Sequence, residues 1–168
     1  MDVVANAILI GFYSELGTLE EACWVFHNMP YHDMVSWSAM ISVCSKHSQS
    51  HTALSLYKEM IQWGFQPNNV VFVSVLTACG NLASLEDARL LHSDLVEYGI
   101  YVEEVLGTSL LNMYGKCGSI QEARYVFGHS LERTIEMQNA LLTTLSHRGI
   151  VDEVETLFRE MQHHSIIP

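Results

Sequence analysis

Residues 107–127 read GTSLLNMYGKCGSIQEARYVF, and this stretch predicts two short helices joined at a glycine. Leu110, Leu111 and Tyr114 recur three and four residues apart, as on one face of a first helix. Gly118 then interrupts the pattern. The residues after it form the apolar stripe of a second helix: Ile120, Ala123, Val126 and Phe127. Two short helices cannot bury both apolar faces alone, so this hairpin needs neighbours.

The same pattern recurs along the rest of the chain. The interruption at Gly118 has counterparts, at steps of 31, 35, 35 and 31 residues, at Gly17, Ser48, Ala83 and Gly149. A small residue early in the second helix follows the same steps: Ala22, Ala53, Ala88, Ala123 and Val154. So does a large residue later in that helix: Phe26, Tyr57, His92, Phe127 and Phe158. Three columns with one set of spacings predict five repeats that form one all-α solenoid domain, at residues 2–32, 33–67, 68–102, 103–133 and 134–168.

Local signals place helix boundaries and the core. Thr18 followed by Glu21 predicts a capping box at the start of the first repeat's second helix. Ser84 and Asp87 open the second helix of the third repeat in the same way. The large aromatic residues within helices fall at positions that favour the core over a platform for stacking a ligand: Trp24, Trp37 and Phe72.

The overall charge is acidic. The formal net charge of −11, from 8 Lys plus Arg against 19 Asp plus Glu, argues against indiscriminate binding to polyanions but leaves room for a local basic track. The chain has no apolar run long enough to cross a bilayer, and its start lacks the basic flank of a secretory signal. Because the repeats begin at residue 2 and run to Pro168, we expect a section of a longer array, separated from any targeting segment.

The residues that usually carry chemistry form no recognisable site. The four cysteines include no CxxC pair, which favours small buried residues in a reducing compartment over disulfides or a zinc site. The sequence has no GxSxG motif and no phosphate-binding glycine loop. We therefore predict a protein that is not an enzyme and has no cofactor and no metal site.

Three runs of the sequence carry a family resemblance: VSWSAMISVCSKHSQSHTALSLYKEMIQWGFQP, FVSVLTACGNLASLEDARLLHSDLVEYG and SLLNMYGKCGSIQEARYVF. They closely resemble pentatricopeptide repeats. The mixed lengths resemble the plant subclass, with short, standard, long, short and standard repeats in that order. The resemblance implies a right-handed superhelix whose first helices line the concave surface, where single-stranded RNA binds at one base per repeat. It also implies a mitochondrial or chloroplast protein that recognises RNA for processing or editing, with the editing activity located elsewhere.

The same resemblance assigns residues to the reading of bases. In the family, a polar residue of the first helix and the final residue of the repeat contact the base edge. Ser38 with Asn68 resembles an adenine-reading pair, whereas Asn139 suggests a pyrimidine and lacks its partner beyond Pro168. The other repeats depart from the pattern, with Thr108 and Thr134 as an unusual purine pair, Ala7 and Asp33 as half a pair, and Val73 and Glu103 outside it.

Further positions are assigned to the rest of the nucleotide. The residues expected to sandwich the bases are valines near the starts of first helices: Val4, Val35, Val70 and Val105. Lys46 and Lys116 sit at equivalent places near the ends of first helices, where the family places a phosphate-contacting lysine. An explanation of these lysines that needs no RNA is equally open, because a cation near a helix C-terminus is stabilised by the helix dipole. Arg148 lies one residue further along its repeat and is less well placed.

A second class of function competes with RNA binding. A helical solenoid also suits protein partners, such as an editing cofactor, and the acidic composition favours this reading. Exposed, contiguous apolar residues in the third repeat, such as Leu90 and Val96, would support it. We also expect self-association through uncapped ends, because the outer faces of the first and last repeats would be apolar.

Overall fold

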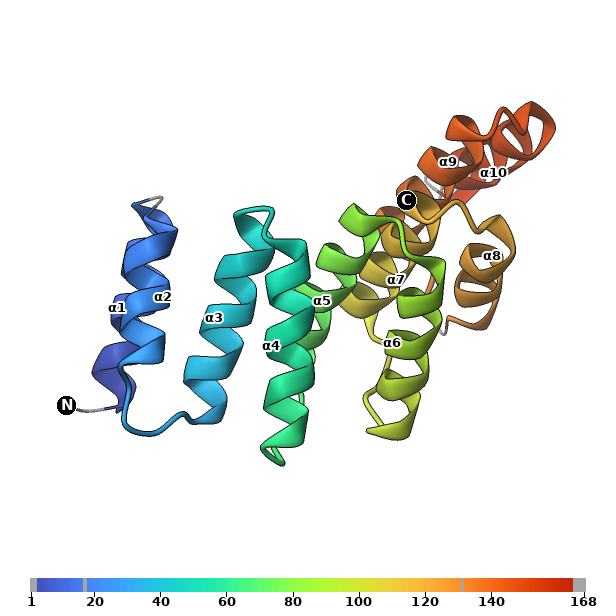
Figure 1. Cartoon of the computed structure of the whole chain (residues 1–168). Helices are drawn as coiled ribbons and strands as arrows, with labels where there is room; N and C mark the ends of the chain where they lie inside the picture. Colours follow the sequence, from blue (N-terminus) through green and yellow to red (C-terminus); the bar gives the residue numbers. More distant parts are fainter. Residues whose placement is uncertain (1–2, 17, 131, 165–168) are drawn as a thin grey trace.

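The computed structural model describes residues 3–16, 18–130 and 132–164, with residues 3–7, 14 and 162–164 described for their backbone alone. All regular structure in these ranges is α-helical, which confirms the predicted fold class. The described part contains ten helices (Figure 1): α1 Val3–Glu15, α2 Leu19–His27, α3 Met34–Lys46, α4 Ser50–Gln62, α5 Asn69–Leu82, α6 Leu85–Glu97, α7 Glu104–Lys116, α8 Ile120–His129, α9 Ile135–His147 and α10 Val151–His164.

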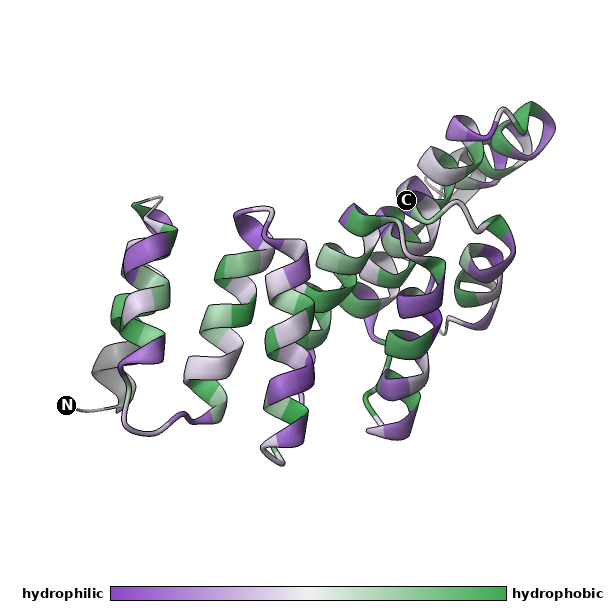
Figure 2. Ribbon diagram, viewed as in Figure 1, coloured by the Kyte–Doolittle hydropathy of each residue, from purple (hydrophilic) through white to green (hydrophobic). Residues whose placement is uncertain are grey.

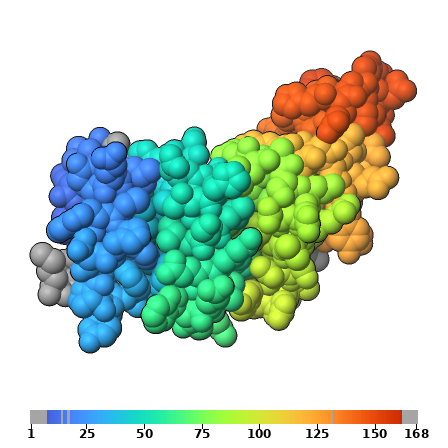
Figure 3. Space-filling view, viewed as in Figure 1, coloured from blue at the N-terminus to red at the C-terminus, as the bar shows by residue number. Residues whose placement is uncertain are grey.

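The helices pair into hairpins that follow one another in sequence order. Each odd-numbered helix, the first helix of its hairpin, packs against the even-numbered second helix that follows it. Figure 3 shows the hairpins as successive bands from the N-terminal to the C-terminal end, so the chain forms an elongated solenoid. Each predicted repeat range contains one hairpin, while the boundaries between repeats stay a prediction.

The first helices form a continuous layer. Each packs against the first helices of the neighbouring hairpins, in the order α1, α3, α5, α7 and α9. Each of the second helices α2, α4, α6 and α8 packs against its own first helix and the next one along. The second helices therefore cover one side of the first-helix layer and leave the other side open.

A residue with a left-handed backbone conformation follows the first helix in every hairpin whose turn is fully described. The φ angles are 59° at Ser48, 53° at Ala83, 78° at Gly118 and 69° at Gly149, while Gly17 lies outside the described residues. These residues are the interruptions that recur in the sequence. Their shared position therefore reflects the need for a positive φ angle in the backbone. A positive φ at this position terminates a helix and turns the chain back.

The predicted core aromatics are confirmed in two cases of three. Trp37 and Phe72 are 1% and 0% exposed, whereas Trp24 is 68% exposed and its assignment to the core is wrong. Trp24 is the sixth residue of α2, and Leu90 and Tyr125, the sixth residues of α6 and α8, are also exposed. This position points away from the first-helix layer.

The predicted capping box at Thr18 is wrong. Thr18 precedes α2 but makes no capping hydrogen bond, because its hydroxyl donates to the carbonyl oxygen of Tyr13 at 3.1 Å. Ser84 does cap α6, accepting from the backbone N–H of Asp87 at 3.3 Å. A full capping box forms at α3, where Ser36 N donates to Asp33 Oδ1 at 2.8 Å and Asp33 N donates to Ser36 Oγ at 2.9 Å.

The cysteines are free thiols; Cys44 and Cys79 are buried as predicted, whereas Cys23 and Cys117 are only half-buried. Burial raises the pKa of the Cys44 and Cys79 thiols to about 12, so these two stay protonated and unreactive at neutral pH. Among the described residues, no group of three or more His, Cys, Asp or Glu side chains is placed to hold a metal ion. None of the described helices combines the length and apolar character needed to span a membrane.

Candidate nucleic-acid interface

One face of the first-helix layer lies open along the solenoid. The second, fifth, ninth and thirteenth residues of a helix lie within about 80° of one another, because successive residues turn by about 100°. In α3, α5, α7 and α9 these residues are exposed or half-buried, apart from buried Ser38. We call them the open face: Val35, Ser38, Ser42, Lys46, Val70, Val73, Thr77, Asn81, Val105, Thr108, Asn112, Lys116, Glu136, Asn139, Thr143 and His147.

The structure brings the predicted adenine-reading pair together. Ser38, the fifth residue of α3, donates its hydroxyl hydrogen to the carbonyl oxygen of Met34 at 2.7 Å. The Asn68 Nδ2 amide donates to Ser38 Oγ at 3.3 Å. Asn68 Oδ1 in turn accepts from the backbone N–H of Val71 at 3.0 Å and caps α5.

These contacts fix the orientation of the Asn68 amide. The N–H of Val71 can only donate, so the amide oxygen has to face it and the amide nitrogen has to face Ser38. Asn68 keeps one N–H and one oxygen lone pair free, and its side chain is exposed. An oriented donor and acceptor side by side can read the edge of a base.

The other predicted pairs are not joined in the same way. Thr134 accepts from the backbone N–H of Met137 at 3.4 Å as the cap of α9, and the buried Thr108 Oγ1 has no hydrogen-bond partner. Asp33 is engaged in the cap of α3, and the side chain of its predicted partner Ala7 lies outside the described residues. Asn139 is exposed.

The first residue of each of the last four predicted repeats has a shared role in the backbone. Asp33, Asn68, Glu103 and Thr134 each stand at the N-cap of the following first helix. Asp33, Asn68 and Thr134 use their side chains to hold that helix start, whereas Glu103 makes no capping hydrogen bond. A substitution there changes the helix start as well as the open face.

Exposed valines repeat along the open face at the second position of α3, α5 and α7. Val35, Val70 and Val105 are 59%, 55% and 63% exposed. The Val4 side chain lies outside the described residues, and α9 has Glu136 at this position. Apolar side chains that repeat once per hairpin are free to contact flat rings, and their role in sandwiching bases stays a prediction.

Cationic side chains gather at the other end of the first helices. Lys46 and Lys116 are exposed, and Lys116 Nζ donates to Oδ1 of Asn81, the equivalent residue of α5, at 2.7 Å. Arg148 lies over the turn after α7, so that a Cβ built on Gly118 would stand 1.7 Å from Arg148 Nη2. Repeat spacing alone does not show that the long Arg148 side chain reaches the turn of the preceding hairpin.

Between α5 and α7 the open face is hollowed into a pocket of about 340 Å³. Its polar lining includes Thr77 and Asn112, the ninth residues of their helices, together with Ser109 and Lys116. Gly80 allows the helices to approach, since a Cβ there would come within 3.2 Å of the Met113 Cα. Sequence analysis did not single out Thr77 and Asn112, although their spacing of 35 residues was a usable signal.

Charge is distributed unevenly between the two helix layers. The helices α3, α5, α7 and α9 carry two lysines and two glutamates, whereas the five second helices carry four basic and twelve acidic residues. Figure 2 shows hydrophilic residues on the second helices α4, α6 and α8. The acidic ones are Glu20, Glu21, Glu59, Glu86, Asp87, Asp94, Glu97, Glu122, Asp152, Glu153, Glu155 and Glu160. Most of the negative charge therefore lies away from the open face.

An acidic edge remains near the starts of α7 and α9. Glu103, Glu104 and Glu132 line a pocket of about 430 Å³. A hydrogen bond with Glu136 raises the pKa of Glu104. This edge is unfavourable for a phosphate, so the half of the open face between α3 and α7 is better suited to a polyanion.

The fold and the open face define a helical-repeat protein with an extended and mostly polar face. Residues 32–81 match the model of the PPR repeat family, and residues 108–134 and 139–166 match the PPR repeat. These ranges cover well over half of the chain, which belongs to the pentatricopeptide repeat family.

Its relatives include named plant organelle proteins. Two pentatricopeptide repeat-containing proteins of Arabidopsis thaliana, At3g24000, mitochondrial, and At5g50390, chloroplastic, are 38% and 35% identical over 77 residues, 46% of this chain. The chain spans 12% and 11% of their lengths.

Solved structures show the same fold. The pentatricopeptide repeat protein PPR10, in complex with an 18-nt psaJ RNA element, matches 100% of this chain and 26% of its own at 17% identity, with a TM-score of 0.86. The PPR domain of Arabidopsis thaliana protein-only RNase P 1, in complex with tRNA, matches 99% of this chain and 92% of its own at 16% identity, with a TM-score of 0.77.

Proposed function

We propose that this chain binds single-stranded RNA along the open face, at one base per repeat, as a non-catalytic specificity module. The hydrogen-bonded pair of Ser38 and Asn68 carries the proposal, because it presents an oriented donor and acceptor on a face with little charge. Two structural neighbours, PPR10 and the PPR domain of RNase P 1, are described in complex with RNA.

Three groups of side chains act on one nucleotide in this proposal. Asn68 reads the base edge and Ser38 holds the Asn68 amide in place. Val35 and Val70 contact the two faces of the base, and Lys46 neutralises the neighbouring phosphate. The pair resembles an adenine-reading combination, so we assign adenine to the second repeat.

The biological setting follows from the resemblance to the plant subclass with five repeats of mixed length. Relatives named mitochondrial or chloroplastic support an organelle location. The chain then recognises an organelle transcript for processing or editing, and the catalytic step belongs to another domain or protein.

Anisotropy titrations against short single-stranded RNAs that differ in one base test this function. We expect the tightest binding with adenine opposite the second repeat. Asn68→Asp is the sharpest variant, because a carboxylate still caps α5 but cannot donate to a base. It should remove the preference for adenine, and Ser38→Ala should weaken that preference.

Matched controls lie close by. Asn69→Ala changes the exposed residue next to Asn68, and Ser93→Ala removes an exposed hydroxyl from α6. Both should leave affinity and base preference unchanged. Binding with no dependence on base or on Asn68 would reject base reading, and no binding at low salt would reject RNA as the ligand.

The surface formed by the second helices, which we call the outer surface, offers a second candidate function, the binding of a protein partner. Leu90 and Val96 are 56% and 66% exposed, but six residues on a helix turn by about 240°, so they do not share one face. The better surface is a groove of about 210 Å³ between α6 and α8, lined by His92, Tyr101, Tyr125 and His129. An editing-cofactor protein that docks here should lose affinity on Tyr125→Ser, whereas RNA binding should not change.

A further inference from the structure

Two hydroxyl groups in the pocket between α5 and α7 have their hydrogens committed to the backbone. Thr77 Oγ1, from the ninth residue of α5, donates to the carbonyl oxygen of Val73 at 2.8 Å. Ser109 Oγ, from the sixth residue of α7, donates to the carbonyl oxygen of Val105 at 2.8 Å. A hydroxyl carries a single hydrogen, so both oxygens can only accept a hydrogen bond from a bound molecule.

This arrangement makes the two hydroxyls unsuited to bind a phosphate, because phosphate oxygens accept hydrogen bonds and need donors. The donors of the pocket belong to two other side chains. Lys116 Nζ donates to Asn81 Oδ1 at 2.7 Å, which leaves further N–H donors of the ammonium group available. Asn112 is exposed and has no hydrogen-bond partner among the residues that the structure describes. The pocket therefore combines two acceptor oxygens with a cation, which suits a ligand that has a hydroxyl group next to a phosphate.

The order of these side chains along the first helices matches the order of groups in a nucleotide. The fifth residues read the base in the proposed function, and the ninth and thirteenth residues lie about 6 Å and 12 Å further along the helix axis. A nucleotide places its sugar between its base and its phosphate. When Lys116, a thirteenth residue, binds a phosphate, the ninth residues Thr77 and Asn112 lie at the level of the sugar. The 2′-hydroxyl of a ribose is a hydrogen-bond donor next to that phosphate.

Among α3, α5, α7 and α9, only the junction between α5 and α7 combines these features. Between α3 and α5 the sixth residue of α5, Ser74, is buried, and the thirteenth residue is the neutral Asn81. Between α7 and α9 the sixth residue of α9 is Ala140, which has no hydroxyl, and the thirteenth is His147. The pocket is therefore specific to the third and fourth hairpins.

We propose that this pocket is a ribose subsite, in which Thr77 Oγ1 or Ser109 Oγ accepts a hydrogen bond from a ribose 2′-hydroxyl and Lys116 binds the adjacent phosphate. The inference rests on the RNA binding proposed above and deepens it, because the 2′-hydroxyl is the group that distinguishes RNA from DNA. The pocket volume of about 340 Å³ lies within the range of small-molecule sites. The two acceptor oxygens then select RNA over single-stranded DNA at one nucleotide.

Anisotropy titrations with RNAs that lack a single 2′-hydroxyl test the proposal. The adenine assigned to Asn68 sets the register, and a 2′-deoxyribose is placed at each nucleotide of the RNA in turn. We expect affinity to fall about twofold to tenfold at one position, one or two nucleotides from that adenine, and to stay unchanged elsewhere. A 2′-fluoro group at the sensitive position should cause the same loss, because it keeps the sugar pucker of RNA but cannot donate a hydrogen bond.

The double variant Thr77→Val with Ser109→Ala removes both acceptor oxygens. It should bind the unmodified RNA as weakly as the wild type binds the 2′-deoxy RNA, and it should no longer distinguish the two. Its affinity for the 2′-deoxy RNA should equal that of the wild type, which also shows that the variant is folded. The control is Thr156→Val on α10, which removes an exposed hydroxyl that donates to the carbonyl oxygen of Asp152 at 2.8 Å. It should keep the full difference between the two RNAs.

Two results would overturn the ribose subsite. One is equal affinity for the unmodified RNA and for every 2′-deoxy RNA, and the other is a dependence on the 2′-hydroxyl that the double variant retains. If base preference through Asn68 persists in either case, the proposed function stands without the subsite. If the chain binds no RNA at low salt, both are rejected.

Discussion

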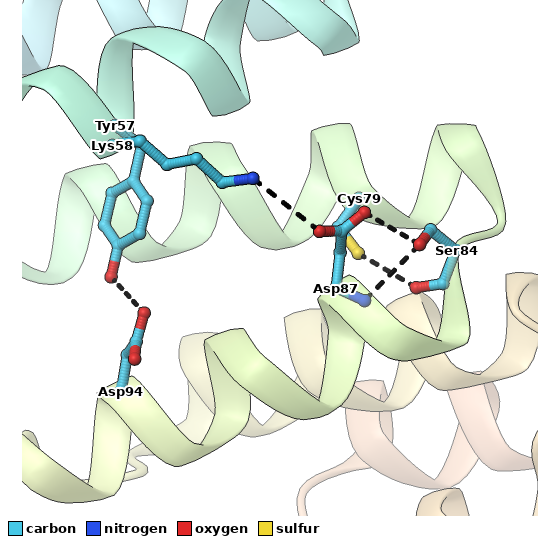
Figure 4. Close-up of polar contacts among 6 residues, drawn as sticks. All are labelled: Tyr57, Lys58, Cys79, Ser84, Asp87 and Asp94. Atoms are coloured by element: carbon cyan, nitrogen blue, oxygen red, sulfur yellow. Dashed lines mark hydrogen bonds and ion pairs between the residues drawn. The ribbon is translucent and has the colours of Figure 1, made fainter.

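Tyr57 links two outer helices through one hydrogen bond. Its hydroxyl donates to Asp94 Oδ2 at 2.9 Å, joining α4 to α6, and the ring is 3% exposed (Figure 4). Burial and this hydrogen bond raise the pKa of Tyr57, so the phenol stays a donor across the usual pH range. Tyr57→Phe should lower the free energy of unfolding by about 1 kcal/mol. Urea denaturation measures this, with Tyr31→Phe, at a 76% exposed ring, as a control that should not change; equal effects of the two would contradict the role of the bond.

His92 makes stability depend on pH. Burial lowers its pKa below 6.5, and Tyr114, whose pKa burial raises to about 12, lies 2.9 Å from His92 Nδ1. The neutral ring is therefore favoured in the fold, and this contribution is complete above pH 6.5 and lost as pH falls toward the lowered value. We expect the stability difference between wild type and His92→Gln to shrink from pH 7.5 to pH 5.5. Parallel pH profiles in urea denaturation would refute this.

At the scale of the element, the turn between paired helices requires a residue with a positive φ angle. Ser48 and Ala83 adopt this conformation although they have a Cβ, which makes it energetically unfavourable. Ala83 adopts a φ of 53°, which disfavours any residue with a Cβ. Ala83→Gly should therefore raise the free energy of unfolding by up to about 1 kcal/mol. Gly118→Ala should lower it, because φ is 78° and the new Cβ would displace the Arg148 guanidinium.

A control separates turn geometry from a general effect of glycine. Ala39 lies inside α3, so Ala39→Gly should cost about 1 kcal/mol. Urea denaturation of the three variants gives opposite signs for Ala83→Gly and Ala39→Gly. The same sign for both would show that the positive φ carries no strain.

Repeat columns predicted the helices and turns well, since each column reflects a burial or backbone requirement met once per hairpin. The same columns also identify surface positions. Trp24 lies within a helix at a position that resembles a packing position, yet the equivalent residues of α4 and α10 are Ser55 and Thr156, which belong on a surface. The cap at Thr18 failed because its hydroxyl found a nearer acceptor, the carbonyl of Tyr13. Such competition between local partners depends on coordinates.

The candidate site was predictable only in part. Ser38 is the fifth residue of α3 and Asn68 is the N-cap of α5, and residues at these two positions recur at the same steps along the chain. The contact between them could therefore be expected from the sequence. Thr108 and Thr134 stand at the same helix positions, a fifth residue and an N-cap, but form no such bond, because Thr134 accepts from the backbone N–H of Met137 and the Thr108 hydroxyl has no partner. Spacing sets which residues lie near each other, and side-chain chemistry decides whether they bind.

At the scale of the whole molecule, the separation of charge determines how salt acts on the proposed RNA binding. A helix is about 10 Å across and the Debye length at 0.1 M salt is also about 10 Å, so the acidic second helices are largely screened from the open face. Lys46, Lys116 and Arg148 then set the salt dependence, with a log-log slope of about −2 for RNA affinity. Arg148→Gln should make this slope shallower by about 0.7, whereas Arg89→Gln, which loses the partner of Glu122 on the outer surface, should not change it. Anisotropy titrations at four salt concentrations measure both slopes, and equal slopes for the two variants would place the phosphates away from the turn at Gly118.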